Sequence, residues 1–415
     1  MNKTIKKSIL FDKQIIKFSF YGFLKNLRFF EPYLLIFLMA NDITLFQIGI
    51  LIAIREIVVH LFEIPSGLIA DYIGCKTELY LCFIFYILSF VAFYFSTSFW
   101  IAMIAMIFFG FGEAFRTGTH KAMIYTYLEN KGWSEYKTFV YGKTRSSSLV
   151  GSAISSLLAI LIVLNLKNPG AVFLISTIPY ILDFLLISTY PNYLNQAEIK
   201  KEVSIKEMIR AIGRDIKNNK NLQRIILGEG MFEAVIKTII DYIQPMLEMI
   251  IIGAGTVVLI NVTAENNLKI MLGVVYFVLN IFGAAASRSS YRLKKKKSAK
   301  YLLNAFYLLL GVELLVLAIG SKQYVIVLIG FLLLYLIQNA RKPIYMDEIG
   351  TQMNKSQRAT ILSIASQLRS LILIVLAPLI GWIADTWGIH IVMYVLALIM
   401  FISFPFIYIK SIKKI

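Results

Sequence analysis

Two long apolar runs are joined by the stretch Glu63-Ile64-Pro65-Ser66-Gly67-Leu68-Ile69-Ala70-Asp71-Tyr72-Ile73-Gly74-Cys75-Lys76. Glu63 and Pro65 interrupt the end of the first run, because proline has no backbone N–H to continue a helix. Gly67 is small enough for close packing, and Asp71 and Lys76 mark a tight polar turn before the second run. The stretch therefore predicts two long helices joined by a short, charged connection.

The composition places the whole chain in a membrane. The 415 residues are 58% hydrophobic, whereas soluble domains are about 45–50% apolar, and the mean hydropathy is +0.72. An apolar run of about 20 residues is long enough to cross the hydrocarbon core as a helix. We predict twelve such spans and an external loop at 250–268. The spans lie at 14–40, 47–70, 78–97, 99–127, 138–165, 170–190, 223–251, 268–287, 301–320, 323–346, 359–384 and 389–410.

The basic residues predict the orientation of these spans. A net charge of +18 on a soluble protein would suggest a nucleic-acid partner, but here the lysines and arginines gather in one set of connections. That set includes Arg341, Lys342 and the loop at 288–300, while the opposite side keeps only three lysines. By the positive-inside rule we expect both termini in the cytoplasm, a bacterial inner-membrane location and no nucleic-acid partner.

The longest of the connections expected in the cytoplasm separates six spans from six. It predicts an N-terminal six-helix bundle at 1–190, a linker at 191–222 and a C-terminal six-helix bundle at 223–415. Within the linker, apolar and basic residues recur at helical spacing over 203–217. This pattern is typical of a basic amphipathic helix that anionic lipids attract to the inner membrane surface. The alternative is a linker helix that only solvates its charges.

Two stretches of the second half echo the turn at 67–76. Gly283–Arg288 keeps the glycine at the end of the eighth span, which is the repeat equivalent of the second span. Gly381–Asp385 matches Gly67–Asp71 more closely, yet it falls at the external end of the eleventh span. Since that position is not repeat-equivalent, we interpret Gly381–Asp385 as a packing and helix-end feature.

Several charged side chains fall inside the predicted spans. Each costs about 2.5–3.5 kcal/mol on insertion scales and usually marks a transport pathway or a paired site. Structural ion pairs between helices and wetted helix ends are the alternatives for any one of them. The three histidines lie on different spans, so we expect no metal site and no cofactor. The residues are Lys25, Arg28, Glu31, Arg55, Glu56, His60, Glu63, Glu113, Arg116, His120, Lys121 and Asp183.

The seventh span is the richest in charge. Glu229, Glu233, Lys237 and Asp241 recur every four residues, so neighbouring members touch along one helix. Lys237 can pair with Glu233 or Asp241, which leaves Glu229 beside a like charge. Two adjacent carboxylates in a low-dielectric cavity do not both stay ionised. Glu229 is therefore the candidate for exchanging protons.

The frame Gly67-x-x-x-Asp71-x-x-Gly74-x-Lys76 resembles the loop between helices 2 and 3 of the major facilitator superfamily of transporters. The resemblance implies an all-α membrane protein of two pseudo-symmetric six-helix bundles, which rock around a midplane site by alternating access. In that family the loop latches the cytoplasmic side. The residues that would carry the gate motif are Glu63, Gly67, Asp71, Gly74 and Lys76.

The same resemblance implies which spans meet the substrate. Spans 1, 4, 7 and 10 line the transport cavity in the family. The candidate substrate and proton pathway is therefore Glu31, Glu113, Arg116, Glu229, Glu233, Lys237 and Asp241.

The chain departs from the family pattern at three points. Tyr72 and Cys75 stand where basic residues are typical, and Met106 stands where the fourth span has an arginine. The Gly-Pro signature of antiporters in the fifth span is absent from the sequence. The Glu63-x-Pro65 sequence before the turn also resembles a variant of the motif in clostridial-type tetracycline exporters.

The sequence predicts a secondary active transporter of the multidrug or metabolite efflux type, and not an enzyme. Its expected activity is proton-coupled export of a small amphipathic or cationic compound. Expected partners are the small-molecule substrate, protons and anionic lipids at the cytoplasmic face, with a monomeric chain. The alternatives are an uptake carrier for a specific metabolite and a membrane-embedded lipid-handling enzyme. No paired-histidine motif, nucleophile elbow or phosphate loop supports the enzyme.

Overall fold

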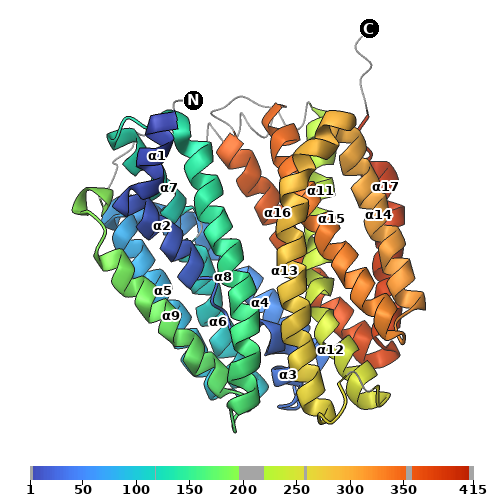
Figure 1. The fold of residues 1–415 in the computed structure, drawn as a ribbon. Coiled ribbons are helices and arrows are strands. Elements are labelled where there is room, and N and C mark those ends of the chain that lie inside the picture. Colours follow the sequence, from blue (N-terminus) through green and yellow to red (C-terminus); the bar gives the residue numbers. More distant parts are fainter. Residues whose placement is uncertain (1–2, 117, 196–218, 257–258, 352–357, 411–415) are drawn as a thin grey trace. The chain divides into compact units, whose positions relative to one another are not determined.

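The computed structural model describes residues 3–116, 118–195, 219–256, 259–351 and 358–410, and the regular elements in these ranges are helices (Figure 1). Ten runs of described residues are long and apolar enough to cross a membrane, with α6 and α7 counted as one run. They match ten of the predicted spans. They comprise α4 (Leu45–Ile73), α5 (Cys75–Tyr94), α6 (Phe99–Arg116), α7 (Thr119–Asn130), α8 (Lys137–Asn165), α9 (Ala171–Ser188), α13 (Ala264–Lys296), α14 (Ala299–Ile319), α15 (Tyr324–Thr351), α16 (Arg358–Trp387) and α17 (Ile389–Ile407).

The other two predicted spans, the first and the seventh, are each built from short pieces. The first consists of α2 (Lys13–Leu24), the 3-10 helix η1 (Glu31–Tyr33) and α3 (Leu34–Met39). The seventh consists of α11 (Lys220–Ile239), η4 (Ile240–Tyr242), α12 (Ile243–Glu248) and the π-helical η5 (Met249–Gly253).

Proline explains part of each interruption. Pro32 lies in the first turn of η1. Pro245 lies in α12 and lacks the backbone N–H that would continue the helical hydrogen bonds from α11. Broken helices at corresponding positions of two halves are a feature of transporters, where they line the binding site.

The chain divides into two compact units. Unit 1 holds Met1–Phe37 and Ile54–Ile199, and unit 2 holds Leu38–Ala53 and Lys200–Ile415. Unit 2 thus includes the first part of α4, which lies within the predicted N-terminal bundle at 1–190. The reason is close packing on α16, since a Cβ on Gly49 would lie 2.3 Å from the Ala377 carbonyl oxygen.

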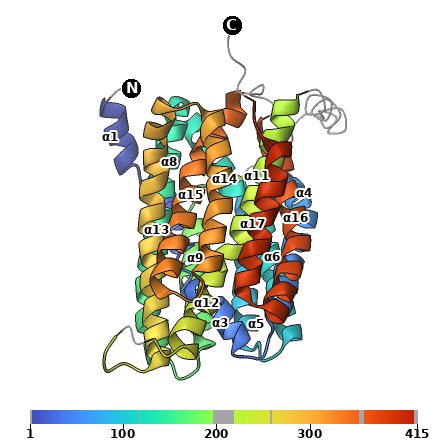
Figure 2. The ribbon, with the colours of Figure 1, turned by 90° about the vertical axis from the view of Figure 1, so that its right-hand side faces the viewer.

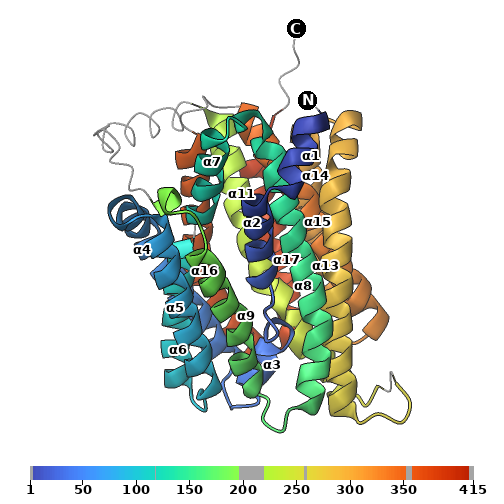
Figure 3. The ribbon, with the colours of Figure 1, turned by 60° about the vertical axis from the view of Figure 1, so that its left-hand side comes forward.

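Within unit 1, α2 runs beside α8, and α5 lies against both α6 and α9 (Figure 3). Glycines allow the close approach of α2 to α8. A Cβ on Gly22 would lie 2.6 Å from Ser148 Oγ, and one on Gly151 would lie 2.5 Å from the Phe23 carbonyl oxygen. Small residues serve this purpose in membrane helices, where interhelical attraction comes from close packing.

Within unit 2, α13 lies against α15, α14 against α17, and α11 against α16 (Figure 2). A buried apolar cluster joins α11, α14, α15 and α16 near one end of the unit, and it includes Ile225, Leu303, Ile349 and Ile361. This packing holds α11, which carries Glu229 and Glu233, against α14, α15 and α16.

The predicted loops differ from the structure at two places. The basic residues of 288–300 were expected in a loop, but α13 continues to Lys296. No glycine or proline stops it there, and lysines in the last turn suit the negative end of the helix dipole. The predicted loop 250–268 is helical at both ends, in η5 and in α13 from Ala264. The amphipathic helix expected at 203–217 lies outside the described residues, and α1 (Lys3–Phe11) was not predicted.

Candidate functional site

Glu113 of α6 is the centre of a polar network inside unit 1. Its carboxylate accepts hydrogen bonds from Arg28 at 2.9 Å and from Arg116 at 2.5 Å. Tyr86 of α5 donates its hydroxyl to the same carboxylate at 2.6 Å. Two guanidinium groups thus share one carboxylate.

The break in the first span is tied into this network. Arg28 follows the end of α2, and its Nε donates to the Tyr180 hydroxyl at 2.9 Å. Tyr180 of α9 in turn donates to the carbonyl oxygen of Lys25 at 3.0 Å. That carbonyl lies where α2 ends, and a freed carbonyl inside a membrane needs a partner. The Arg28 guanidinium also lies 5.3 Å from the Phe109 ring centre, a cation–π distance.

A pocket of about 210 Å³ lies next to this network, between α2, the start of α7 and α8. Basic side chains gather along its wall, and none of its described lining residues is a carboxylate. The basic residues are Lys25, Arg116, His120, Lys121 and Arg145. The pocket also has hydroxyl groups, from Tyr21, Tyr141, Thr144 and Ser148.

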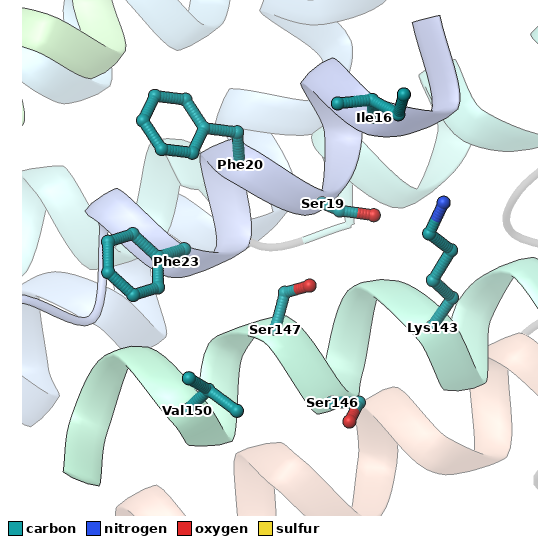
Figure 4. Close-up of a pocket in the computed structure, with 8 residues that line it drawn as sticks. All are labelled: Ile16, Ser19, Phe20, Phe23, Lys143, Ser146, Ser147 and Val150. Carbon is teal, nitrogen blue, oxygen red and sulfur yellow. The ribbon is translucent and has the colours of Figure 1, made fainter. Parts of the chain in front are cut away.

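A second, open and largely apolar pocket of about 500 Å³ uses the opposite faces of α2 and α8 (Figure 4). Figure 4 shows Ser19, Ser147 and Lys143 in the space between the two helices. Phe20 and Phe23 form the aromatic side of this pocket, with their rings stacked at 5.9 Å. The helix pair α2 and α8 therefore separates a cationic pocket from an apolar one.

Two acid–base pairs join α11 to α15 in unit 2. Glu229 forms a hydrogen-bonded ion pair with Arg341, and both side chains are almost fully buried. Glu233 accepts a hydrogen bond from Lys342 at 3.0 Å, and the Lys342 side chain remains half exposed. The two carboxylates and Lys342 line a pocket of about 90 Å³ together with Arg369.

These pairs correct two sequence-based interpretations. Glu229 was expected to have only a like-charged neighbour, and Arg341 was counted with the inner-surface charges. The structure instead buries Arg341 to 3% exposure and pairs it with Glu229. Spacing along α11 detects partners on that helix only, whereas the partner of Glu229 comes from α15.

The other pathway candidates are Glu31, Lys237 and Asp241. Lys237 and Asp241 are half-buried farther along the seventh span, where Tyr276 donates to Asp241 at 3.3 Å. Gln244 donates to the same tyrosine at 2.9 Å. Glu31 begins η1, and its carboxylate lies close enough to Arg28 and Glu113 to interact with them electrostatically. Of the seven candidates, the structure therefore brings together Glu31, Glu113 and Arg116 in unit 1, and Glu229, Glu233 and Lys237 in unit 2.

The gate motif has a clear structural role at two of its residues. Lys76 donates from Nζ to the carbonyl oxygens of Ser188 at 2.8 Å and Tyr190 at 3.0 Å, at the C-terminal end of α9. Gly74 has a φ of +89°, and a Cβ there would lie 2.2 Å from the Asn195 carbonyl oxygen. These contacts fix the turn between α4 and α5 to the end of α9.

The remaining gate residues are less constrained. Gly67 is exposed, and a Cβ at this position would meet no atom within 4 Å. Glu63 is half-buried, and its carbonyl oxygen accepts a hydrogen bond from Ser66. The side chain of Asp71 lies outside the described part of the chain, so its role as a latch stays a prediction.

Sequence reasoning missed several residues of these sites. Arg145 lies inside a predicted span but was not counted among the buried charges, and Lys342 was placed at the inner surface. Tyr86 and Tyr180 lie in apolar runs with other tyrosines, and no sequence pattern distinguishes them from lipid-facing aromatics. A search for every basic residue inside a span boundary would have found Arg145, Arg341 and Lys342.

Two broken helices at corresponding positions, and buried ion pairs between spans, are features of a polytopic membrane carrier. The family model of the Major Facilitator Superfamily matches residues 23–371. Since this match covers well over half of the sequence, the chain belongs to the Major Facilitator Superfamily. It is a multi-pass membrane transporter and not an enzyme.

Individual relatives add detail to the family assignment. The chain is 27% identical over 231 residues to the uncharacterized MFS-type transporter YxaM of Bacillus subtilis (strain 168). That match covers 52% of this chain and 54% of YxaM, so it spans about half the length of the curated relative.

Solved structures of transporters share the fold. A point mutant of the nucleoside transporter NupG matches with a TM-score of 0.79 at 11% identity, over 95% of this chain and 99% of that chain. A bacterial homologue of the human lysosomal transporter Spinster, in an inward-facing and occupied conformation, matches with a TM-score of 0.72 at 14% identity. It covers 98% of this chain and 97% of its own. At these identities the likeness shows the fold alone.

Proposed function

We propose that the chain exports a small amphipathic compound by alternating access and exchanges it for protons. Transport follows from the family, while export and proton coupling are the proposed steps. We further propose a bacterial inner-membrane location with both termini in the cytoplasm, in line with the distribution of basic residues.

The observation that carries the proton-coupling proposal is the buried Glu229–Arg341 pair between α11 and α15. A buried ion pair is stable only while both partners are charged, and removal of one charge leaves the other uncompensated. Protonation of Glu229 would therefore release Arg341. Because the two residues come from different helices, this release would loosen α11 from α15.

Glu233 completes the proposed coupling unit. It lies one helical turn from Glu229 and is paired with Lys342, whose side chain is half exposed. That exposure gives the pair a route to water. Protons would enter through the Glu233–Lys342 side and reach Glu229, which is almost fully buried.

The expected class of substrate is narrowed by charge. Sequence patterns favoured an amphipathic or a cationic compound. A cation would meet the basic wall of the pocket between α2, α7 and α8, which has no carboxylate among its described lining residues, and this does not favour the cationic class. The apolar pocket of α2 and α8 beside the cationic one suits an amphipathic molecule.

Uptake of a specific metabolite is the second candidate. It is supported by the fold likeness to NupG, which is a nucleoside transporter. The direction of transport distinguishes the two candidates, because export and uptake would both use the broken first and seventh spans.

A vesicle assay tests the proposed function. Inside-out vesicles with the full chain receive an imposed proton gradient, acid inside, and a panel of amphipathic compounds. Export predicts accumulation of at least one compound that collapses when the gradient is dissipated. Accumulation only in right-side-out vesicles would favour uptake, and gradient-independent movement in both would contradict proton coupling.

The matched pair of variants is Glu229→Gln and Glu265→Gln. Both remove one carboxylate, but Glu265 is exposed at the start of α13 and pairs with Lys269 on its own helix. Coupling through Glu229 predicts lost accumulation in the first variant and normal accumulation in the second. Equal accumulation in the two variants would remove Glu229 from the coupling step.

A further inference from the structure

The cationic pocket of unit 1 is built from matching faces of two helices. The α2 residues on its wall are Phe18, Tyr21, Gly22 and Lys25, and the α8 residues are Tyr141, Thr144, Arg145 and Ser148. Both sets follow the spacing i, i+3, i+4 and i+7, so each set forms a continuous helix face. The pocket is therefore a structural feature of the α2–α8 pair.

The positive charge of this pocket is only partly balanced by the protein. Among the described residues, Lys25, Lys121 and Arg145 have no carboxylate within ion-pair distance, and Arg116 shares Glu113 with Arg28. Asp183 and Glu113 act on Lys25 from farther away, and Lys121 and Arg145 are exposed. An anion in the pocket would lie beside all four basic groups and would form the closer contacts that the carboxylates do not.

The start of α7 adds further donors to the same place. The residue before the first turn is Gly118, and no described side chain caps the helix there. Gly118, His120 and Lys121 all line the pocket. Free N–H groups and the positive end of the helix dipole favour an anion at such a terminus.

An unpartnered buried hydroxyl is a second, independent sign of a ligand. Tyr21 is 3% exposed and lines the pocket, and its hydroxyl has no hydrogen-bond partner among the described atoms. Its ring stacks on His120 at 3.6 Å, which fixes its position. A buried hydroxyl without a hydrogen-bond partner is unfavourable, so a ligand that accepts a hydrogen bond from it would remove this cost.

We propose that this pocket binds the carboxylate or phosphate group of the transported compound. At about 210 Å³ it is smaller than the ~300–1,000 Å³ clefts that hold whole drug-sized ligands. It therefore takes the anionic end of the substrate, and the substrate is an amphipathic organic anion. The identity of the occupant as a substrate rests on the proposed transport function; the binding of an oxyanion does not.

Binding to the purified full-length chain in an uncharged detergent tests this proposal without any gradient. The probes are benzoate, benzamide and benzylamine, which share one ring and differ in charge, together with inorganic phosphate. Calorimetry is expected to show binding of benzoate and phosphate, at least tenfold tighter than benzamide, and no binding of benzylamine. Benzylamine binding as tight as that of benzoate would overturn the proposal.

Two variants of one helix localise the binding. Arg145→Gln removes a charge from the cationic pocket, whereas Lys137→Gln removes one from the start of α8, where Lys137 pairs with Glu129 and lines neither pocket. Arg145→Gln is expected to weaken benzoate binding about tenfold, and Lys137→Gln is expected to leave it unchanged. Equal effects of the two variants would contradict the assignment to this pocket.

A lipid headgroup has the same chemistry and is the rival occupant. The titration is repeated in nanodiscs of phosphatidylcholine with and without phosphatidylglycerol. A substrate site predicts the same benzoate affinity in both. Loss of benzoate binding when phosphatidylglycerol is present would identify the pocket as a lipid site and overturn the proposal. Normal benzoate binding with failed transport would refute only the proposed function.

Discussion

Asp385, at the end of α16, accepts a hydrogen bond from the backbone N–H of Phe46 at 2.7 Å, and its second oxygen accepts one from Leu45 at 3.0 Å. These N–H groups belong to the first turn of α4, so Asp385 caps that helix from a residue 339 positions away. The interpretation of Gly381–Asp385 as a helix-end feature is confirmed. Gly381 allows the contact, since a Cβ there would lie 2.2 Å from the Leu45 carbonyl oxygen.

Removing this cap is expected to open the first turn of α4. Substituting a capping residue by alanine costs about 1 kcal/mol, and this corresponds to roughly fivefold faster local opening. Asp385→Ala should therefore raise amide hydrogen exchange at 45–48, measured by mass spectrometry on the purified chain. Asp385→Asn should have a smaller effect, because asparagine also caps helices.

The neighbouring Thr386 supplies the control for that experiment. It is exposed, and its hydroxyl bonds only to the Trp382 carbonyl of its own helix in the structure. Thr386→Ala should leave exchange at 45–48 unchanged. A faster exchange in both variants would mean that general loosening of α16 is responsible, and not the cap.

Glu113→Gln should destabilise unit 1 because it leaves Arg28 and Arg116 without their shared carboxylate. Breaking a buried ion pair costs about 3–5 kcal/mol, and the 22% exposure of Glu113 places the expected cost at the lower end. The measurement is thermal unfolding in detergent. The double variant Glu113→Gln with Arg28→Met should recover part of the loss, and additive losses would show that the two side chains are not energetically coupled.

Lys76→Gln should weaken the end of α9. Lys76 is 8% exposed and binds two carbonyl oxygens at that end. A glutamine reaches less far and carries no charge, so we expect faster hydrogen exchange at 187–190 and a lower unfolding temperature. Lys17 also donates to this region, to the Thr189 carbonyl oxygen, but it does so from α2. Lys17→Gln is the control, and a larger effect from it than from Lys76→Gln would contradict the role given to the motif lysine.

Asp71→Asn tests the gate role that the family resemblance implies. Asp71 belongs to the last turn of α4, and the prediction is that it helps to hold the cytoplasmic side closed. The variant should insert and unfold like the parent chain, yet transport more slowly in the vesicle assay. Parental transport by Asp71→Asn would leave the motif with only the structural role seen at Gly74 and Lys76.

The span count and most helix ends could be predicted from sequence, because burial in lipid requires long apolar helices. The ten long apolar runs match predicted spans closely. The breaks in the first and seventh spans were harder to predict, since a proline such as Pro32 or Pro245 can also kink a helix without interrupting it. Capping of α4 by Asp385 depends on a tertiary approach, and only the glycine pattern at 381–385 hinted at it.

Ion-pair partners could not be predicted, for a physical reason. Neighbours at i+3 and i+4 lie on one helix, and that spacing places Glu113 on the same helix face as Arg116. It cannot find Arg28, which approaches Glu113 from the broken first span, or Arg341, which approaches Glu229 from α15. The cationic pocket escaped notice for a similar reason, since its basic residues come from α2, α6, α7 and α8.

Proton coupling at Glu229 is tested most directly in proteoliposomes, with a panel compound that the parent chain transports. Accumulation under an imposed proton gradient and exchange without a gradient are measured for Glu229→Gln and for Glu113→Gln. We expect Glu229→Gln to lose accumulation and keep exchange, because only the proton step is removed. Full gradient-driven accumulation in Glu229→Gln, together with its loss in Glu113→Gln, would place the coupling site in the first half and contradict the central proposal.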